Sequence, residues 1–176
     1  MVKQPSGPGE RATAEASFDW EATYRDLLPR VYHFLWFRVG DPYIAEELAG
    51  STFEKAWKSR QRLKGGRDGF SRWVFVIARN EASAYLRRKR DEAPLTEEME
   101  DAEGEQPEER AAAGSDVSKL AKLLKGLGGR ERELVGLKYG AGLTNRAISA
   151  LTGLSESNVG TILHRVVGRL RREWEA

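Results

Sequence analysis

The sequence predicts an all-α protein, built from two small helical domains that are joined by an acidic, flexible linker. Apolar side chains recur at helical spacing in residues 18–90 and again in residues 117–176, without the period-two alternation or hairpin turns of a β protein. Residues 91–116 carry 11 acidic side chains and no aromatic ones, so they bury too little apolar area to offset the cost of ordering. Residues 1–17, rich in Pro, Gly, Ser and Ala, are expected to form a flexible tail.

Three helices are expected in the first domain. The first covers about residues 20–39, and Pro29 is expected to break or kink it because proline lacks an amide hydrogen. Asp41-Pro42 starts the second helix as N-cap and first-turn proline. The loop LKGGRDG, at 63–69, leads to a third helix over Ser71–Arg90.

The second domain is expected to hold four shorter helices separated by glycines. Thr144 and Ser155 are plausible N-caps, each flanked by the apolar pair of a hydrophobic staple. Two short capped helices joined through Thr152-Gly153-Leu154-Ser155 predict a helix-turn-helix. The four expected segments are Ser118–Leu127, Arg130–Tyr139, Asn145–Thr152 and Glu156–Trp174.

Composition excludes several classes of protein. The chain has no cysteine, so disulfides and thiolate metal sites are excluded, and its two histidines match no metal-ligand spacing. No stretch approaches the roughly 20 apolar residues that span a bilayer, and residues 1–17 lack the apolar core of a signal peptide. We therefore expect a cytoplasmic protein without cofactor, metal or membrane insertion.

The charge distribution suggests a polyanionic partner. Residues 18–90 hold 15 basic against 9 acidic side chains, and residues 117–176 hold 11 against 5. Such basic domains suit nucleic acid, because each phosphate contact releases counterions. An ordinary solvated surface explains the same charges equally well.

The last predicted helix has two different faces. Val159, Leu163 and Val166 lie on one face and suit packing against the preceding helices. In a helix-turn-helix, early residues of the second helix read base edges in the major groove. The opposite face carries Ser157, Gly160, Thr161, His164 and Arg165. A plain helical core with a polar outer face is the alternative.

The helix over Ser71–Arg90 carries a basic and polar edge opposite its aromatic stripe. Such a strip can follow one DNA strand, while aromatics and a glycine loop accept an unstacked base. Trp73 and Phe75, taken alone, fit a core better than a base platform. The edge consists of Arg72, Arg79, Asn80, Ser83 and Arg87.

Two stretches of the sequence resemble a known family. The segment DPYIAEELAGSTFEKAWKSR, followed by FSRWVFVIARNEASAYLRRKR, resembles the second conserved region of extracytoplasmic-function sigma factors. Their fourth region resembles LGGRERELVGLKYGAGLTNRAISALTGLSESNVGTILHRVVGRLRREW. The resemblance covers about Ala22–Arg90 and Leu120–Trp174, in the family's order and with its usual linker. One helix-turn-helix match is weak, whereas the paired arrangement is specific.

The resemblance implies a non-enzymatic subunit of RNA polymerase that directs transcription initiation from promoters. Its implied partners are the core enzyme, contacted at the largest-subunit coiled coil and at the flap, and promoter DNA. An anti-sigma factor is a candidate third partner. Residues 18–90 then correspond to sigma region 2, and residues 117–176 to sigma region 4.

The resemblance also assigns candidate site residues. Glu46 and Glu47 are the better polymerase-contact candidates, and Phe53 and Trp57 suit internal packing. The polymerase-binding or supporting set is Glu46, Glu47, Leu48, Thr52, Phe53 and Trp57. The set for reading and melting the minus-10 element is Lys64, Arg67, Arg72, Arg79, Asn80, Ser83, Arg87 and Arg88. The minus-35 set is Arg146, Ser157, Asn158, Gly160, Thr161, His164, Arg165 and Arg169.

The chain departs from the family at the groove-facing helix. Many relatives carry basic residues where this sequence has Gly160, Ile162 and Val167. The surface that reads the minus-35 element is therefore less basic than usual, which predicts weaker phosphate anchoring there.

Three other classes of protein are alternatives to a sigma factor. An enzyme has little support, because the sequence shows no phosphate-binding glycine loop after a strand, no HExxH motif and no nucleophile with a nearby base. A stand-alone helix-turn-helix regulator would carry a sensor domain in place of the basic strip. A polymerase-binding interaction module that reads no promoter is the third alternative.

Overall fold

The computed structural model describes residues 19–62, 66–92 and 116–176, and every secondary-structure element in these ranges is helical. This confirms the all-α prediction. The predicted tail, Lys64 and nearly all of the predicted linker lie outside the described residues. The elements are α1 (Trp20–Val39), α2 (Pro42–Ser59), η1 (Arg60–Arg62), α3 (Gly66–Glu92), α5 (Asp116–Lys125), α6 (Gly129–Val135), η2 (Gly136–Gly140), α7 (Asn145–Thr152) and α8 (Glu156–Glu175).

Helix α1 is a single helix that passes through Pro29, so of the two expected effects of this proline, a break or a kink, the break is wrong. Pro29 is exposed, and the carbonyl that loses its helical partner can therefore bond to water. Asp19 caps the start by accepting a hydrogen bond from the amide of Ala22, at 3.0 Å. Gly40 ends the helix in the left-handed conformation, with φ of 76°.

Helices α2 and α3 complete the first unit, which we define as α1, α2, η1 and α3. The Asp41 carboxylate accepts hydrogen bonds from the amides of Tyr43 and Ile44, which confirms the predicted cap. Helix α3 begins at Gly66, earlier than the predicted Ser71, so part of the expected loop is helical. The three helices enclose a core that includes Phe34 and Phe75, whose ring centroids lie 6.3 Å apart.

The second unit, defined as α5 to α8 with η2, contains the predicted helix-turn-helix. Thr144 and Ser155 cap α7 and α8 through hydrogen bonds from the amides of Ala147 and Asn158. Gly153, with φ of 75°, makes the turn between them. Element η2 is a π-turn that the sequence did not indicate, closed by the amide of Ala141 bonding to the carbonyl of Gly136 at 2.9 Å.

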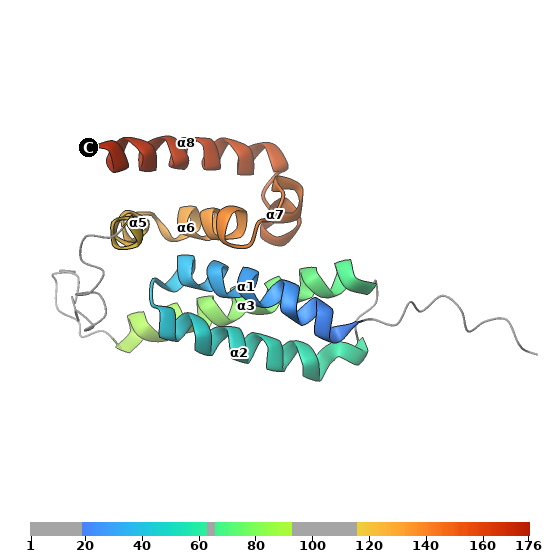
Figure 1. Cartoon of the computed structure of the whole chain (residues 1–176). Coiled ribbons are helices and arrows are strands. Elements are labelled where there is room, and N and C mark those ends of the chain that lie inside the picture. Colours follow the sequence, from blue (N-terminus) through green and yellow to red (C-terminus); the bar gives the residue numbers. More distant parts are fainter. Residues whose placement is uncertain (1–18, 63–65, 93–115) are drawn as a thin grey trace, which may run out of the picture.

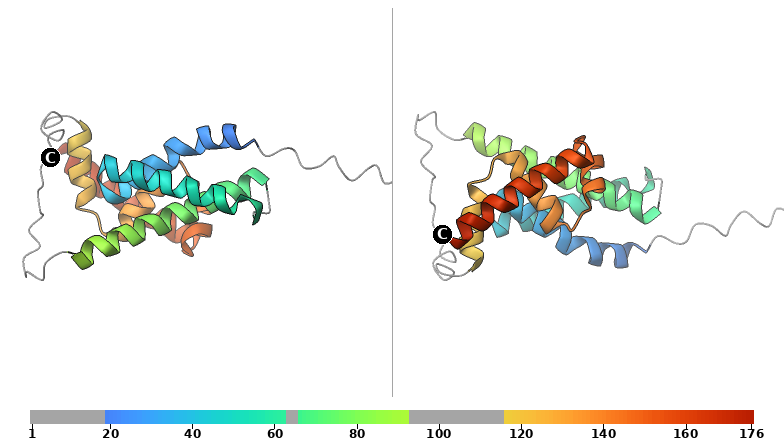
Figure 2. Two further views of the ribbon diagram at one scale, coloured as in Figure 1. Left: turned by 90° about the horizontal axis from the view of Figure 1, so that it is seen from below. Right: turned by 90° about the horizontal axis from the view of Figure 1, so that it is seen from above.

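The two units pack against each other in layers (Figure 1). Helices α6 and α7 lie over α1 and α3, α2 lies on the far side of the first unit, and α8 forms the opposite outer layer. Seen from above, α8 lies in front and crosses over the other helices (Figure 2, right). One hydrophobic cluster contains buried residues from both units. None of the described helices combines the length and apolar character needed to cross a bilayer.

Candidate nucleic-acid and polymerase interfaces

The two faces of α8 are arranged as the sequence predicted. Val159, Leu163 and Val166 are buried against the rest of the second unit. Four predicted minus-35 residues are exposed on the outer side, namely Ser157, Thr161, His164 and Arg165. Because α8 is the outer layer of the molecule, this face is open to a DNA duplex in the present arrangement.

Three further residues of the predicted minus-35 set lie around the helix-turn-helix. Arg146, at the start of α7, and Asn158, in the first turn of α8, are exposed. Gly160 is turned toward α7, because a Cβ there would lie 3.4 Å from Nδ2 of Asn145. This distance is close to an ordinary van der Waals contact, so Gly160 stays a predicted minus-35 residue.

Arg169, the last of this set, is engaged within the second unit. Its Nη2 lies 2.6 Å from Oε2 of Glu131, and Arg165 lies more loosely at 3.8 Å from the same carboxylate. The hydrogen bond from Arg169 and the two positive charges lower the pKa of Glu131. Arg169 is thus already engaged in an ion pair, whereas Arg165 is 71% exposed and can reach outward.

The basic strip on α3 is only partly free. Asn80, Ser83 and Arg87 are exposed, as are Arg72 and Arg88. Arg79 is different, since its side chain is 24% exposed and its Nε donates to Oε1 of Glu133 at 2.9 Å. Its Nη1 also donates to the carbonyl of Leu151. The structure therefore does not bring all five strip residues together on one open edge.

The start of α3 holds one more predicted minus-10 residue. Arg67 is exposed and lies 3.2 Å from Asp26 of α1, a surface ion pair that contributes little stability.

The predicted polymerase-binding residues divide between the surface and the interior of α2. Glu46 and Glu47 are exposed on the helix that lies farthest from the second unit. Leu48, Thr52 and Phe53 are buried, with exposures of 5, 0 and 5%, so they support the helix without touching a partner. The Lys55–Glu81 ion pair and the hydrogen bond from Ser51 to Glu81 hold this helix against α3.

Trp57 belongs to a group of aromatic side chains that the sequence did not indicate as a group. It is 42% exposed, its ring packs edge-on against Trp20 at 4.5 Å, and the Arg60 guanidinium lies 3.7 Å above it. Trp73 is also half-exposed, and its indole nitrogen lies 3.4 Å from the Ser59 hydroxyl. Only the Trp57–Arg60 spacing of three was a signal in the sequence. The contact between Trp20 and Trp57 and the contact between Trp73 and Ser59 depend on the fold.

The described residues contain no group of three or more His, Cys, Asp or Glu side chains arranged to hold a metal ion.

Comparisons with known proteins match both units separately. Residues 23–92 match the Sigma-70 region 2 family, and residues 123–172 match the Sigma-70, region 4 family. The chain is 31% identical to the RNA polymerase sigma factor CarQ of Myxococcus xanthus over 92% of both chains. It is 28% identical to the ECF RNA polymerase sigma factor BldN of Streptomyces coelicolor, covering 93% of this chain but only 63% of that protein.

A solved structure shares the fold of nearly the whole chain. This is the sigma factor RpoE of Bartonella quintana, crystallised in complex with the anti-sigma factor NepR. The match has a TM-score of 0.70 at 21% identity and covers 90% of this chain and 98% of RpoE. The likeness therefore extends across both units.

Proposed function

Because the chain belongs to the extracytoplasmic-function sigma factors of bacterial RNA polymerase, we propose that it binds the core enzyme and directs promoter-specific initiation by reading minus-10 and minus-35 elements. The observation that carries the proposal is that a region 2 unit and a region 4 unit occur in this order in one chain. Sigma factors are initiation factors and not enzymes, in keeping with the absence of catalytic motifs from the sequence.

Core binding is assigned to the exposed side of α2. Glu46 and Glu47 supply negative charge there, and the buried Phe53 and Leu48 beneath them hold the helix in place. Charged groups at the rim of such an interface mainly set association rate and specificity. The region 4 unit is assigned the contact with the polymerase flap.

Recognition of the minus-10 element is assigned to α3 and the loop before it. The exposed part of the strip consists of Arg72, Asn80, Ser83 and Arg87, and Arg88 extends its charge. Melting needs no catalytic group, because binding the unpaired strand more tightly than the duplex shifts the equilibrium between them. Unstacking a base costs a few kcal/mol, which these contacts offset.

Recognition of the minus-35 element is assigned to the outer face of α8. Thr161, His164 and Arg165 present hydrogen-bonding groups on an exposed, capped helix, as a helix-turn-helix requires. Arg146, exposed at the start of α7, is assigned a contact with the DNA backbone.

Two further assignments complete the proposal. The chain acts in the cytoplasm and associates with the nucleoid when active. The complex of RpoE with an anti-sigma factor supports an anti-sigma factor as a candidate partner for this chain as well.

Transcription with purified core polymerase tests the proposal. Initiation at specific promoters should depend on adding this chain and on no other sigma factor. Activity that requires a second sigma factor would instead identify a stand-alone regulator, and core binding without promoter specificity would identify an interaction module.

Asn80→Ala gives the sharper version of the same test. Asn80 is exposed on α3, whereas the predicted polymerase contacts Glu46 and Glu47 lie on α2. The variant should impair open-complex formation more than core binding, as measured by permanganate reactivity of unpaired thymines and by a core-binding titration. Glu46→Gln is the matched comparison, since it should weaken core binding first. Loss of core binding with normal opening in Asn80→Ala would contradict the assignment.

A further inference from the structure

One carboxylate of the second unit lies against two arginines of α8. Oε2 of Glu131, on α6, accepts a hydrogen bond from Nη2 of Arg169 at 2.6 Å, and its Oε1 lies 3.8 Å from Nη2 of Arg165. Both arginines belong to the predicted minus-35 set, whereas Glu131 belongs to no predicted site. The side chain of Glu131 is 20% exposed, so its carboxylate is shielded from water more than either arginine side chain.

The first turn of α6 holds this carboxylate in place. Glu131 is the third residue of the helix, and it accepts a hydrogen bond from the backbone of Gly128, the N-cap residue. The hydrogen bond from Arg169, with the charges of Arg169 and Arg165 and the bond from Gly128, outweighs burial and lowers the pKa of Glu131. The side chain is therefore a charged carboxylate at neutral pH.

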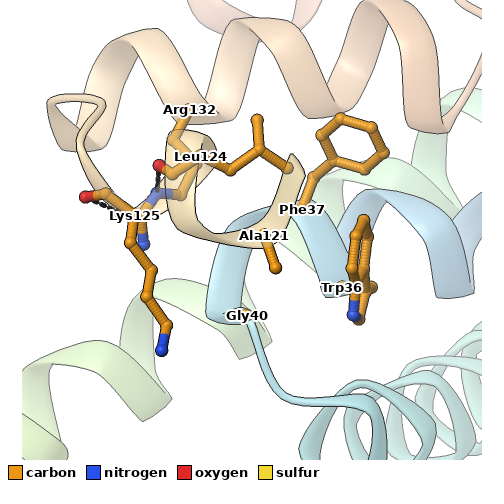
Figure 3. Close-up of a pocket in the computed structure, with 7 residues that line it drawn as sticks. All are labelled: Trp36, Phe37, Gly40, Ala121, Leu124, Lys125 and Arg132. Atoms are coloured by element: carbon orange, nitrogen blue, oxygen red, sulfur yellow. Dashed lines mark hydrogen bonds between the residues drawn. The ribbon is translucent and has the colours of Figure 1, made fainter. Parts of the chain in front are cut away.

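The neighbouring residue, Arg132, anchors the same turn of α6 to α5 (Figure 3). Its Nε donates to the carbonyl of Leu124 at 2.8 Å, and its Nη2 donates to the carbonyl of Lys125 at 2.5 Å. The cations that lower the pKa of Glu131 are those of α8. Because its turn is anchored, Glu131 stays with α6 when the arginine side chains of α8 move outward.

The two arginines continue the predicted DNA-reading face of α8. Arg165 and Arg169 lie one and two helical turns after Thr161, which is exposed on this face. Arginine forms the same kind of charge-assisted hydrogen bond with a carboxylate as with a phosphate. Glu173 lies 4.0 Å from Nε of Arg169 and is a second, looser acidic neighbour. The positive charge of Arg169 is therefore already balanced before DNA binds.

We propose that Glu131 acts as a built-in substitute for a DNA phosphate at Arg169 and, more weakly, at Arg165, and so limits the sequence-independent binding of DNA by the second unit. The proposal rests on the proposed function, because it assigns a role at the edge of the minus-35 face. While Glu131 balances Arg169, a phosphate contact by this arginine releases fewer counterions than a contact by an arginine without such a partner. Phosphate contacts carry no sequence information, so the effect falls on the affinity for any duplex.

Glu131→Gln tests the proposal on the full chain. Glutamine removes the negative charge but keeps an oxygen that accepts the bond from Gly128, as it does at this position of a capping box. Affinity for a scrambled duplex should rise roughly two- to fivefold at low salt, the factor that corresponds to one exposed ion pair. The slope of log affinity against log salt concentration should steepen by about one, because Arg169 then releases counterions on binding. Fluorescence anisotropy over a salt series measures both quantities.

Glu175→Gln is the matched control, since it changes the net charge equally at an exposed position near the end of α8. It should leave the salt slope unchanged. The sign of the change in affinity separates the proposal from a purely structural role. If the Glu131–Arg169 pair only held α8 on α6, its loss would loosen the recognition helix and weaken DNA binding. Circular dichroism verifies that both variants keep their helices.

Equal changes in Glu131→Gln and Glu175→Gln would assign the effect to net charge and overturn the proposal, as would an unchanged or lowered affinity in Glu131→Gln. A promoter duplex measured in parallel separates this result from the proposed function. A gain with both duplexes, without preference for the promoter in either chain, would refute minus-35 reading and leave the role of Glu131 standing. Preference for the promoter without a gain would do the reverse. Binding of neither duplex by either chain, alone or on core polymerase, would refute both.

Discussion

The two predicted DNA-binding surfaces differ in how strongly their side chains are bonded within the protein itself. On α8, Thr161 and His164 point away from the rest of the molecule, and Arg165 has only a loose contact within its own unit. On α3, Arg79 is held across the boundary between the units by Glu133 and Leu151. Both surfaces looked alike in the sequence, as polar and basic residues on one helical edge.

This difference shows that a basic residue on the polar edge of a helix can stabilise the fold, bind a ligand, or do both at different times. Arg79 sits in an ion pair whose carboxylate is 14% exposed, so water does not screen it fully. Arg165 is largely in water, where an ion pair contributes little and DNA competes easily. We therefore expect substitutions at the two arginines to act on different equilibria.

The largest expected effect separates the two faces of α8. Leu163→Ala removes a side chain that is 5% exposed and should lower the free energy of unfolding of the second unit by about 2–5 kcal/mol. Thr161→Ala, two residues away on the outer face, should change it by less than about 0.5 kcal/mol. Urea denaturation measures both. Equal effects would mean that the outer face is also core.

A double-mutant cycle measures how strongly Arg79 interacts with Glu133. Arg79→Ala, Glu133→Ala and the double variant should give a coupling energy of about 1.5–3 kcal/mol in unfolding experiments, the range for a charged hydrogen bond. The same cycle on Arg165 and Glu131, 3.8 Å apart and more exposed, should give about 0.2–1 kcal/mol. A coupling energy at Arg79 no larger than that at Arg165 would remove the contrast between the two surfaces.

In DNA-binding experiments the ranking should be the opposite, with the substitution at Arg165 having the larger effect. Arg165→Ala should weaken recognition of minus-35 duplex by about 1–3 kcal/mol if its contact is bidentate to a base. The loss should appear with the promoter sequence and be smaller with a scrambled duplex, as followed by fluorescence anisotropy. Binding that does not depend on sequence in the parent chain would take this role away from Arg165.

Local patterns in the sequence predicted most of the helices and their caps. Asp41, Thr144 and Ser155 cap helices as expected, because capping depends on residues only two or three positions apart. Pro29 was expected to interrupt α1, but burial of Leu27 and Val31 on either side of it holds the helix together. Tertiary packing outweighed the local preference of proline there.

The contacts between units could not be predicted in this way. Arg79 and Glu133 are 54 residues apart in sequence, and residues 93–115 lie between their helices. Gly136 and Gly140 lie directly against α1, which is distant in the chain. A glycine pair four positions apart and an isolated arginine are common in any helical protein, so neither marks an interface until the fold brings them together.

Removal of the N-cap of α8 should moderately destabilise the first turn of this helix. Ser155→Ala loses the hydrogen bond from the amide of Asn158 to the serine hydroxyl, 3.2 Å in the structure, and should destabilise the second unit by about 1 kcal/mol. Hydrogen exchange at the first turn of α8 should rise, while α3 stays unchanged. Ser155→Asp, which also caps, should restore protection, and failure of this rescue would show that serine has another role there.

The smallest expected effect is a pH dependence of the free energy of unfolding, confined to the second unit. The hydrogen bond from Arg169 lowers the pKa of Glu131, so the folded state favours the carboxylate. A lowered pKa contributes stability that is fully present above the unfolded value of about 4.5 and is lost as pH falls through the lower, folded value. The contribution should be about 0.2–1 kcal/mol, because Arg169 is partly exposed.

Glu131→Gln should therefore reduce the loss of second-unit stability between neutral pH and pH below about 4.5, as measured by urea denaturation at each pH. Glu156→Gln, at an exposed position in the first turn of α8, removes one carboxylate without removing this ion pair and serves as the control. If both variants flatten the profile equally, net charge and not the Glu131–Arg169 pair sets the acid sensitivity. If neither does, the α6–α8 contact depends on apolar burial alone. Leu163 and its buried neighbours then hold α8 in place without help from charge.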